Sequence, residues 1–260
     1  MSFVEKGDKN METKNIGQFC GSVLLSEDCW DRKQLLAQLE EEWEIDFSSG
    51  DSLIDEVSIV GEVDGCEVVI SKFPVPVPDQ EAEINAENNF MWEDAVEVAR
   101  RHKAHIVVAV LGNEGSPLER GIIYTKILAT CTKQKSAIGV FASGVVFEPS
   151  YYYEAAQLIK ENVVPVANLV WIGLYGSDEG ISAYTYGMED FGKREMEIIN
   201  SKKGLEEVYD FIASIAAYVL ADDVELKDEE TIGFSENDKH KIVCSQGVAF
   251  PDIDTLKITD

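Results

Sequence analysis

The sequence is poor in basic residues. It contains 22 lysines and arginines against 49 aspartates and glutamates, which gives a formal net charge of −27 at pH 7. Such a surface repels the phosphates of nucleic acids and anionic membranes, so we expect neither as a partner. It favours a basic protein partner, although solubility alone is also a sufficient reason for an acidic surface.

The acidic residues are concentrated in two blocks. Residues 27–67 carry 14 acidic and 2 basic residues, and residues 205–260 carry 14 acidic and 4 basic residues. The intervening residues 68–204 are nearly balanced, with 18 acidic and 13 basic residues. If the blocks meet in the fold, they form one negative surface, and if they lie apart, the charge says little about a partner.

The sequence also lacks paired cysteines and long apolar runs. Its five cysteines form no C-x-x-C motif, which is typical of a reduced, cytoplasmic protein, and Cys20, Cys66 and Cys131 lie in apolar segments that predict core positions. No run approaches the roughly 18 apolar residues of a membrane span. The first residues are polar and resemble no signal peptide, so we predict a disordered tail over 1–16 and a cytoplasmic location.

Motifs that would identify an enzyme or a metal site are missing. The segment 111–121 lacks the G-K-[ST] ending of a phosphate loop, and 141–149 lacks the G-x-S-x-G motif of serine hydrolases. His102 and His105 flank a turn, where we expect capping or surface histidines, and the only other histidine is His240. We therefore predict no metal site and no cofactor, and the sequence leaves open whether the protein is an enzyme.

The order of the predicted elements indicates an α+β fold. Hydrophobic periodicity and an Asp-Gly hairpin turn predict six elements in the order βαββαβ, which is that of a ferredoxin-like unit. These are a strand at 19–25, a helix around 30–43, strands at 57–63 and 66–73, a helix at 79–103 and a strand at 105–111.

A helix with a strong start signal follows. Ser116 as the cap, Pro117 at the first position and Glu119 form a capping-box pattern, and the helix extends to about Lys133. After it the βαββαβ order repeats, with a strand at 137–142, a helix at 150–161, strands at 168–175 and 181–186, a helix at 203–220 and strand material within 231–244.

We therefore predict two tandem ferredoxin-like (βαββαβ) halves joined by a connector helix. The halves cover residues 17–114 and 135–250, the connector covers 115–134, and 251–260 is a tail. A single continuous α/β sheet with helices on both faces is the alternative, because glycine-bounded apolar strands suit it as well.

Three asparagines lie in the predicted helix 79–103, although asparagine is a poor helix-interior residue. With Ile84 at zero on a helical wheel, Asn88 falls about 40° away, inside the apolar stripe, and Asn85 and Asn89 fall about 100° and 140° away. An unpaired buried amide costs about 1–3 kcal/mol, so these side chains are expected to be hydrogen-bonded.

Three interpretations of these amides remain open. In the structural one, Asn85 and Asn88 hold the upstream FPVPVP segment against the helix. In the functional one, Glu83, Asn85, Asn88 and Asn89 line a small polar pocket for a ligand, with His102 at the end of the helix. In the third, the helix begins later, with Asn85 or Asn88 as its cap.

Four segments resemble a bacterial family catalogued as a domain of unknown function. They are CGSVLLSEDCW, FPVPVPDQEAEINAENNFMW, HKAHIVVAVLG and AIGVFASGVVFEPSYYYE, and the resemblance extends over roughly residues 17–250. It is most specific where P-x-P is followed by E-A-E-x-N-A-x-N-N-x-M-W. The resemblance implies a bacterial, cytoplasmic protein and brings no activity, so it transfers no catalytic residue.

Two functions from different classes are consistent with the sequence. A non-enzymatic, immunity- or inhibitor-like protein would use an acidic surface against a basic protein partner. An enzyme or small-molecule binder would use the polar pocket around Glu83, Asn85, Asn88 and Asn89. We favour the binding protein, because the net charge is large and no catalytic motif is complete. The oligomeric state does not follow from the sequence.

Overall fold

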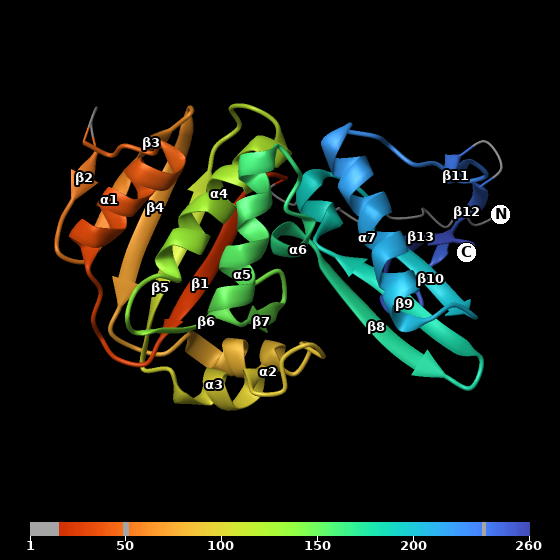
Figure 1. The fold of residues 1–260 in the computed structure, drawn as a ribbon, viewed down its shortest axis with the longest axis horizontal. Coiled ribbons are helices and arrows are strands. Elements are labelled where there is room, and N and C mark those ends of the chain that lie inside the picture. Colours follow the sequence, from red (N-terminus) through yellow and green to blue (C-terminus); the bar gives the residue numbers. More distant parts are fainter. Residues whose placement is uncertain (1–15, 49–51, 236–237) are drawn as a thin grey trace, which may run out of the picture.

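The strands form two sheets that lie side by side, with helices packed against them (Figure 1). The computed structural model describes residues 16–48, 52–235 and 238–260. The α+β class is therefore confirmed, and the predicted tail lies outside the described residues up to residue 15.

The elements agree with the sequence pattern at most positions and add several short strands. The first sheet contains β1 (Phe19–Leu25), β2 (Leu53–Ile54), β3 (Ser58–Val63), β4 (Cys66–Phe73), β5 (Ala104–Leu111), β6 (Ala137–Ala142) and β7 (Val145–Phe147). The second contains β8 (Trp171–Ser177), β9 (Gly180–Tyr186), β10 (Met196–Ser201), β11 (Thr231–Ser235), β12 (Asp238–Gln246) and β13 (Asp254–Ile258). The helices are α1 (Arg32–Trp43), α2 (Glu81–Ala86), α3 (Ala95–Arg101), α4 (Pro117–Cys131), α5 (Pro149–Ala156), α6 (Val166–Leu169) and α7 (Leu205–Ala221), with 3-10 turns at Pro78–Gln80, Gln157–Glu161 and Met188–Phe191.

The first sheet does not have the ferredoxin-like strand order. Its order is β2-β3-β4-β5-β1-β6-β7. A ferredoxin-like half splits its second βαβ unit by inserting the first strand between the third and fourth, whereas here β4 and β5 pair directly. β1 instead lies between β5 and β6 and is antiparallel to both. The tandem ferredoxin-like arrangement is thus not confirmed, and neither is a single continuous sheet.

The predicted boundary at residue 135 falls inside the first sheet. β6 and β7, which we assigned to the second half, complete this sheet beside β1. The physical reason lies in β1, which is buried at every position except Cys20 and therefore needs a paired strand on each side. Element order alone does not state which strand supplies that partner.

The second sheet has its last strand in the middle. Its order is β11-β12-β13-β10-β9-β8, and β13 is parallel to β10 and antiparallel to β12. The prediction that residues 251–260 form a tail is wrong, because Thr255, Leu256 and Ile258 are buried in this strand. Acidic residues flank these positions, so the sequence pattern did not reveal this short core strand.

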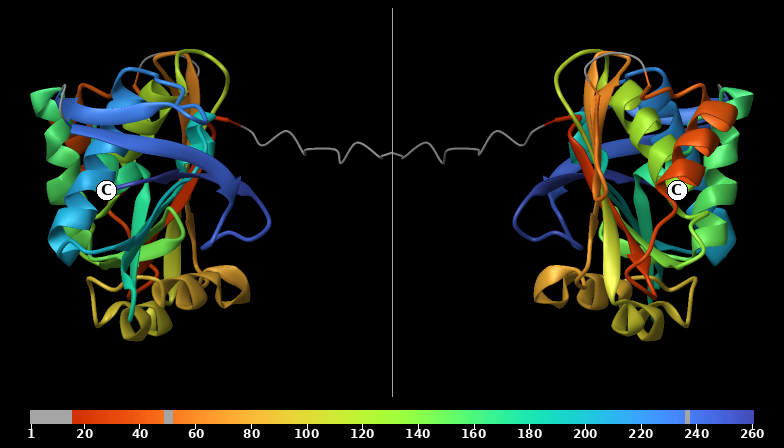
Figure 2. Two further views of the ribbon diagram at one scale, coloured as in Figure 1. Left: turned by 90° about the vertical axis from the view of Figure 1, so that its right-hand side faces the viewer. Right: turned by 90° about the vertical axis from the view of Figure 1, so that its left-hand side faces the viewer.

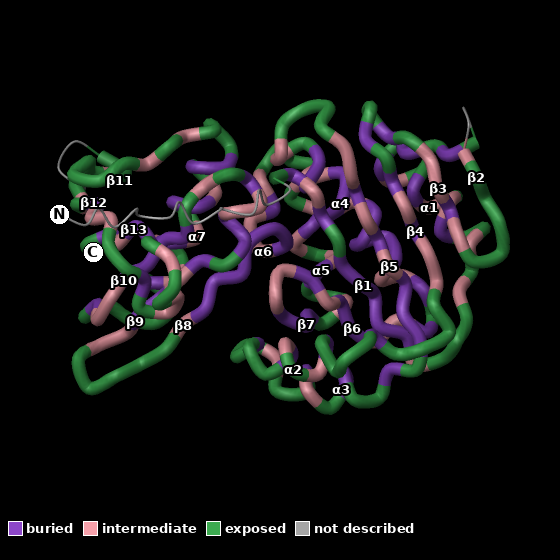
Figure 3. The backbone as a smooth tube through the Cα atoms, turned by 180° about the vertical axis from the view of Figure 1, so that it is seen from behind, coloured by how far each residue is buried: buried purple, intermediate pink, exposed green. Residues whose placement is uncertain are grey.

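Helices cover the two sheets unequally. Figure 2 shows α1, α4 and α5 on one side of the first sheet, and α7 packs on β8, β9 and β10 of the second. Figure 3 shows that buried positions concentrate in the central strands and in α4. A smaller core on the opposite face of β1 and β7 contains Leu24 and Val146, where α2 and α3 pack. Their neighbours Val23 and Val145 belong to the main core, as strand alternation requires.

The predicted helix 79–103 is broken in two. α2 ends at Ala86 and α3 begins at Ala95, so Asn88 and Asn89 lie in the connection between them. The helical wheel therefore placed them wrongly: Asn89 is buried, with 8% of its surface exposed, and Asn88 is exposed. The chain leaves the helix here because amides bond to β7 in preference to the helix backbone.

The two acidic blocks lie at opposite ends of the molecule. Residues 27–67 form α1 and the β2–β4 edge of the first sheet, whereas 205–260 form α7 and the β11–β13 part of the second (Figure 1). They do not combine into one negative surface. Within the described residues, no helix is both long and apolar enough to cross a membrane.

Candidate functional site

The asparagines of the α2–α3 connection bind the backbone of the β6–β7 hairpin. Asn88 Nδ2 donates to the Gly144 carbonyl at 3.0 Å, and Asn89 Nδ2 donates to the Val146 carbonyl at 2.9 Å. Asn89 Oδ1 also accepts from Met91 N at 2.8 Å. Asn85 Nδ2 donates within its own helix to the Glu81 carbonyl. These amides therefore attach the connection to the first sheet.

The two amides at the connection differ in burial, and we expect different costs on replacement. Asn89→Leu should lower the free energy of unfolding by about 2–3 kcal/mol, because it leaves the Val146 carbonyl without its buried donor and the partly buried Met91 N–H without its acceptor. Asn88→Leu removes one exposed hydrogen bond and should cost about 1 kcal/mol or less. Urea unfolding of both variants checks this, and equal losses would contradict it.

Two histidines, and not the asparagines, hold the proline-rich segment. His102 Nε2 accepts from Val77 N at 2.8 Å, and its Nδ1 contacts the Ala99 carbonyl, so Nδ1 carries the proton. His105 Nδ1 bonds to the Val75 carbonyl at 2.8 Å. Burial lowers the pKa of His105, and the Val75 carbonyl opposes this. Both side chains are buried, so neither is a surface histidine, but His102 is the C-cap of α3, as the capping alternative predicted.

A cavity of about 210 Å³ lies between the α2–α3 connection and the β8–β9 hairpin. We call it the aromatic cavity. Its lining consists of two amides, one glycine and four aromatic rings: Asn85, Asn88, Gly144, Trp171, Tyr184, Tyr186 and Phe250. The cavity is small against the roughly 300–1,000 Å³ of drug-sized sites, so it suits a ligand, or part of one, with few heavy atoms.

Strand pairing brings three of these rings to one face. Trp171 pairs with Tyr186, and Gly173 pairs with Tyr184, so alternation places all four positions on the same side of the β8–β9 hairpin. Gly173 makes room for the Tyr184 ring, which a Cβ atom at this position would overlap. Gly144, at φ +70°, does the same for Tyr186. The cavity therefore depends on two glycines as well as on its rings.

The fourth ring closes the cluster from the loop 247–253 between β12 and β13. The centroid of Phe250 lies 5.3 Å from that of Tyr184 at an interplanar angle of 87°, and 6.1 Å from that of Tyr186. The pair with Tyr184 is edge-to-face, an arrangement that stabilises aromatic clusters by about 0.5–1.5 kcal/mol beyond burial. The loop between β12 and β13 therefore contributes one residue, Phe250, to the lining of the aromatic cavity.

The indole N–H of Trp171 is buried, and the acceptor that it faces is the Tyr184 hydroxyl. Trp171 as a whole is 3% exposed. Burial raises the pKa of the Tyr184 hydroxyl, and a hydrogen bond from the Trp171 N–H opposes this rise. Trp171 and Tyr184 both line the aromatic cavity, so this contact belongs to its wall.

A second cavity adjoins the first and has an acidic lining. Its volume is about 360 Å³, it shares Tyr186 and Phe250 with the aromatic cavity, and we call it the acidic cavity. Four of its lining residues are acidic: Glu189, Asp190, Glu195 and Asp252.

Glu195 is the buried carboxyl group of the acidic cavity, with 4% of its surface exposed. It accepts from the Thr185 hydroxyl at 2.6 Å and from Gly187 N at 2.8 Å. Burial raises the pKa of Glu195 to about 7, and these hydrogen bonds together with Glu189 N limit the rise. A group of this kind exchanges a proton near neutral pH.

The loop that carries Phe250 is anchored by a second buried glutamate. Glu197 is fully buried, and its carboxylate accepts from Val248 N at 3.0 Å and from Ala249 N at 2.6 Å. The Thr255 hydroxyl donates to it at 2.7 Å, and Lys257 Nζ lies 3.1 Å away. Glu197 therefore holds the loop against β10 and β13.

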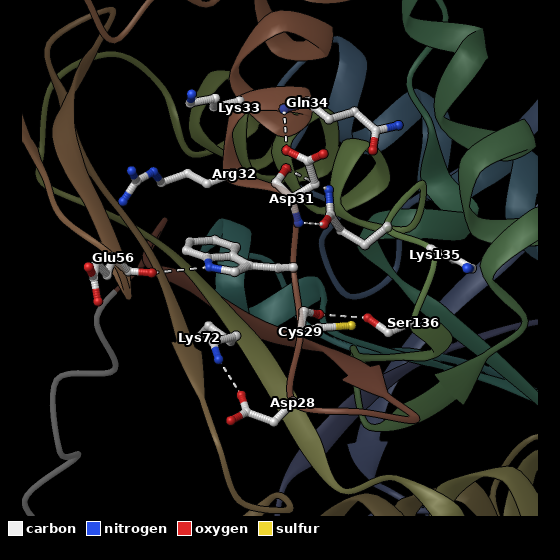
Figure 4. Close-up of a pocket in the computed structure, with 12 residues that line it drawn as sticks. Asp28, Cys29, Asp31, Arg32, Lys33, Gln34, Glu56, Lys72, Lys135 and Ser136 are labelled. Atoms are coloured by element: carbon white, nitrogen blue, oxygen red, sulfur yellow. Dashed lines mark hydrogen bonds and ion pairs between the residues drawn. The ribbon is translucent and has the colours of Figure 1, made fainter.

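A larger crevice of about 690 Å³ lies at the start of α1 (Figure 4). Four basic residues line it: Arg32, Lys33, Lys72 and Lys135. Figure 4 shows Arg32 and Lys33 extending to one side and Lys135 to the other, so their charges do not converge. Lys72 is paired with Asp28, and the Asp31 carboxylate accepts from Gln34 N at the helix N-terminus. The place an anion would take is thus occupied by the protein's own carboxylate.

Metal chemistry has no support in the described residues. Among residues 16–48, 52–235 and 238–260, no group of three or more His, Cys, Asp or Glu could hold a metal ion. The same residues contain no disulfide: Cys66 and Cys131 are buried as predicted, whereas Cys20, which we predicted at a core position, is exposed.

The predicted site residues separate in the structure. Asn85 and Asn88 line the aromatic cavity, whereas Glu83, Asn89 and His102 do not. Their role in ligand binding stays a prediction. The sequence analysis missed Trp171, Tyr184 and Tyr186, although the spacings W-x-G and Y-x-Y on two predicted hairpin strands indicate one shared face. Phe250 carried no comparable signal, because it lies in a loop far along the chain.

Residues 184–259 match the family model described as "Domain of unknown function (DUF4261)". The resemblance to a domain of unknown function is confirmed by this match, which lies C-terminal to the four segments that carried it. The matched region contains Tyr184, Tyr186, Glu195 and Phe250. We found no match among curated proteins or solved structures.

Proposed function

We propose that the protein binds a small organic molecule in the aromatic cavity. The observation that carries this proposal is a cavity of about 210 Å³ whose wall consists of four aromatic rings, two amides and one glycine. Rings supply apolar contact area and the few polar groups supply orientation, which is the usual composition of a ligand site. Asn85 and Asn88 each donate a hydrogen bond through Nδ2, which leaves their carbonyl oxygens available as acceptors.

A basic protein partner has less support from the fold than from the sequence. The acidic blocks lie at opposite ends of the molecule, so the net charge is spread over the surface (Figure 1). A spread charge keeps a protein soluble and does not select a partner. The partner therefore stays a prediction, and the aromatic cavity is the better-supported site.

The experiment uses benzamide, a planar probe with one hydrogen-bond acceptor and one donor group. We expect saturation-transfer NMR to detect benzamide on the native protein at millimolar concentration. Tyr186→Leu removes one ring from the wall of the cavity and should weaken binding about 2- to 10-fold, the value of one aromatic contact. It should change the free energy of unfolding by no more than about 1 kcal/mol, because Tyr186 is 45% exposed.

Tyr218→Leu on α7 is the matched control. Tyr218 is also 45% exposed and does not line the aromatic cavity, so this variant should bind benzamide like the native protein. If Tyr186→Leu and Tyr218→Leu bind the probe equally well, the aromatic cavity is not the site.

A further inference from the structure

The aromatic cavity has room for one ring and little more. Its volume is about 210 Å³, and an apolar cavity of about 150 Å³ is enough for benzene. A free ligand of this size makes few contacts, so a ligand that binds tightly needs further contacts outside the cavity. The surface beside the cavity therefore bears on what occupies it.

Exposed aromatic rings extend the lining of the cavity to the surface. Phe90, Tyr175 and Tyr186 are each 38–45% exposed. The ring centroid of Phe90 lies 5.4 Å from that of Trp171, and the ring centroid of Tyr175 lies 6.4 Å from that of Tyr184. Exposed rings that continue into a pocket are typical of a protein-binding surface.

β8 has an open edge beside these rings. It is the last strand of the second sheet, only β9 pairs with it among the described strands, and its residues 175–177 are exposed. Edge strands are usually protected by charged residues, proline or a bulge, and β8 has none of these. Figure 1 and Figure 3 show β8 as the strand of this sheet that lies nearest α2. Alternation places Tyr175 on the cavity side with Trp171, so a strand added to β8 would turn every second side chain to that side.

The charges next to the cavity indicate which kind of segment would add here. Residues 79–99, which supply both amides of the lining, contain seven acidic residues and no basic one. Four of the acidic residues are exposed and have no salt-bridge partner in the described part of the chain: Glu81, Glu87, Glu93 and Asp94. They attract a segment with basic residues, whereas a second copy of this chain, with a net charge of −27, would be repelled.

We propose that an extended segment of another protein adds to the outer edge of β8 and places an aromatic side chain in the aromatic cavity, with basic residues on either side of that side chain. The strand pairing supplies backbone hydrogen bonds, and the cavity selects the side chain. This inference rests on the proposed function, because the cavity must admit a single ring, and it adds the open edge of β8 as a second contact.

The probe is a short blocked peptide with phenylalanine at its centre, a threonine on each side of it and two lysines at each end. Calorimetric titration of the full chain should show binding, and replacing the phenylalanine of the peptide by alanine should weaken it about 10- to 100-fold, the value of burying one ring. Tyr186→Leu should weaken binding of the phenylalanine peptide about 2- to 10-fold and leave the alanine peptide unaffected. Tyr218→Leu is again the matched control and should bind both peptides like the native protein.

Backbone methylation of the peptide tests the strand pairing. In an added strand every second residue turns its N–H toward β8, and the residues between them turn theirs to solvent. Two peptides are methylated on alternate backbone nitrogens, one on each set. One of them should lose at least about 10-fold in affinity, and the other should bind like the unmethylated peptide. Equal binding of the two would exclude strand addition and overturn the inference.

Other results overturn the inference in distinct ways. Peptide binding that depends neither on the phenylalanine nor on Tyr186 would place the peptide elsewhere on this acidic protein. Exchange of the lysines for glutamates without loss of affinity would overturn the basic character of the segment. A native protein that sediments as a dimer and binds no peptide would assign the edge of β8 to a second copy. If benzamide binds and no peptide does, this inference alone fails, and if neither binds, the proposed function fails with it.

Discussion

Replacing Glu197 by leucine is expected to lower the free energy of unfolding by about 3–5 kcal/mol, the usual cost of breaking a buried ion pair from one side. The variant leaves Lys257, the Thr255 hydroxyl and the N–H groups of Val248 and Ala249 without their shared acceptor. Burial alone would raise the pKa of Glu197, and these donors lower it below its usual value, so the native protein holds the carboxylate charged.

The measurement is urea unfolding of the variant beside two matched controls. Glu197→Gln keeps the size and one acceptor oxygen and should lose about 1–2 kcal/mol. Glu154→Leu changes an exposed glutamate on α5 and should stay within about 0.5 kcal/mol of the native protein. A loss for Glu197→Leu no larger than that for Glu154→Leu would mean that the loop 247–253 is held by other contacts.

Glu195 is expected to make the protein less stable as the pH rises from about 4.5 to about 7. The pKa of Glu195 is raised from 4.5 to about 7, first by burial, against the hydrogen bonds from Thr185 and Gly187. Between these values the unfolded chain has lost the proton while the native protein keeps it, so the native state binds more protons and loses stability with increasing pH. Over about 2.5 pH units the loss approaches about 3 kcal/mol.

Glu195→Gln isolates this contribution from the rest of the surface charge. Glutamine keeps an acceptor for Gly187 N and cannot ionise, so the variant should match the native protein near pH 4.5 and exceed its free energy of unfolding by about 2–3 kcal/mol at pH 8. The difference between the two proteins cancels the repulsion among the other acidic groups. A difference that is the same at pH 5 and pH 8 would show that Glu195 does not titrate on folding.

Features that depend on a few neighbouring residues were predicted well from the sequence. The Asp64-Gly65 turn takes positive φ values of 50° and 81°, as expected for a two-residue hairpin, and Ser116 and Glu119 form the predicted capping box. β1 and β6 have the predicted bounds. Each of these features is decided by a few neighbouring residues, so the sequence contains its cause.

Pairing between distant segments was beyond these signals. The apolar sequence of β1 predicts a buried strand with a neighbouring strand on each side. That these neighbours are β5 and β6 depends on how α4 and α5 cover one face of the sheet. The prediction of one continuous helix over 79–103 is wrong for the same reason. Asn88 and Asn89 bond to Gly144 and Val146, which lie more than 50 residues away in the sequence.

Only part of the candidate site could be predicted from the sequence. Asn85 and Asn88 stood out as polar residues in an apolar segment, and both line the aromatic cavity. Glu195 and Glu197 were not singled out, since glutamates in an acidic chain carry no mark of burial. Their positions follow from β10 and β13 pairing in parallel, a contact that joins residues 60 apart, such as Met196 and Leu256.

The position of β13 has a consequence for how the protein is made. β8, β9 and β10 leave the ribosome before β13. The edge of β10 that faces β13 therefore stays unpaired until residues 254–258 have emerged. An open apolar strand edge invites pairing with other chains, so the nascent protein is exposed to aggregation over the whole time in which α7 and β12 are translated. Slow translation of residues 205–253 would lengthen that interval, and chaperones that cover strand edges would act during it.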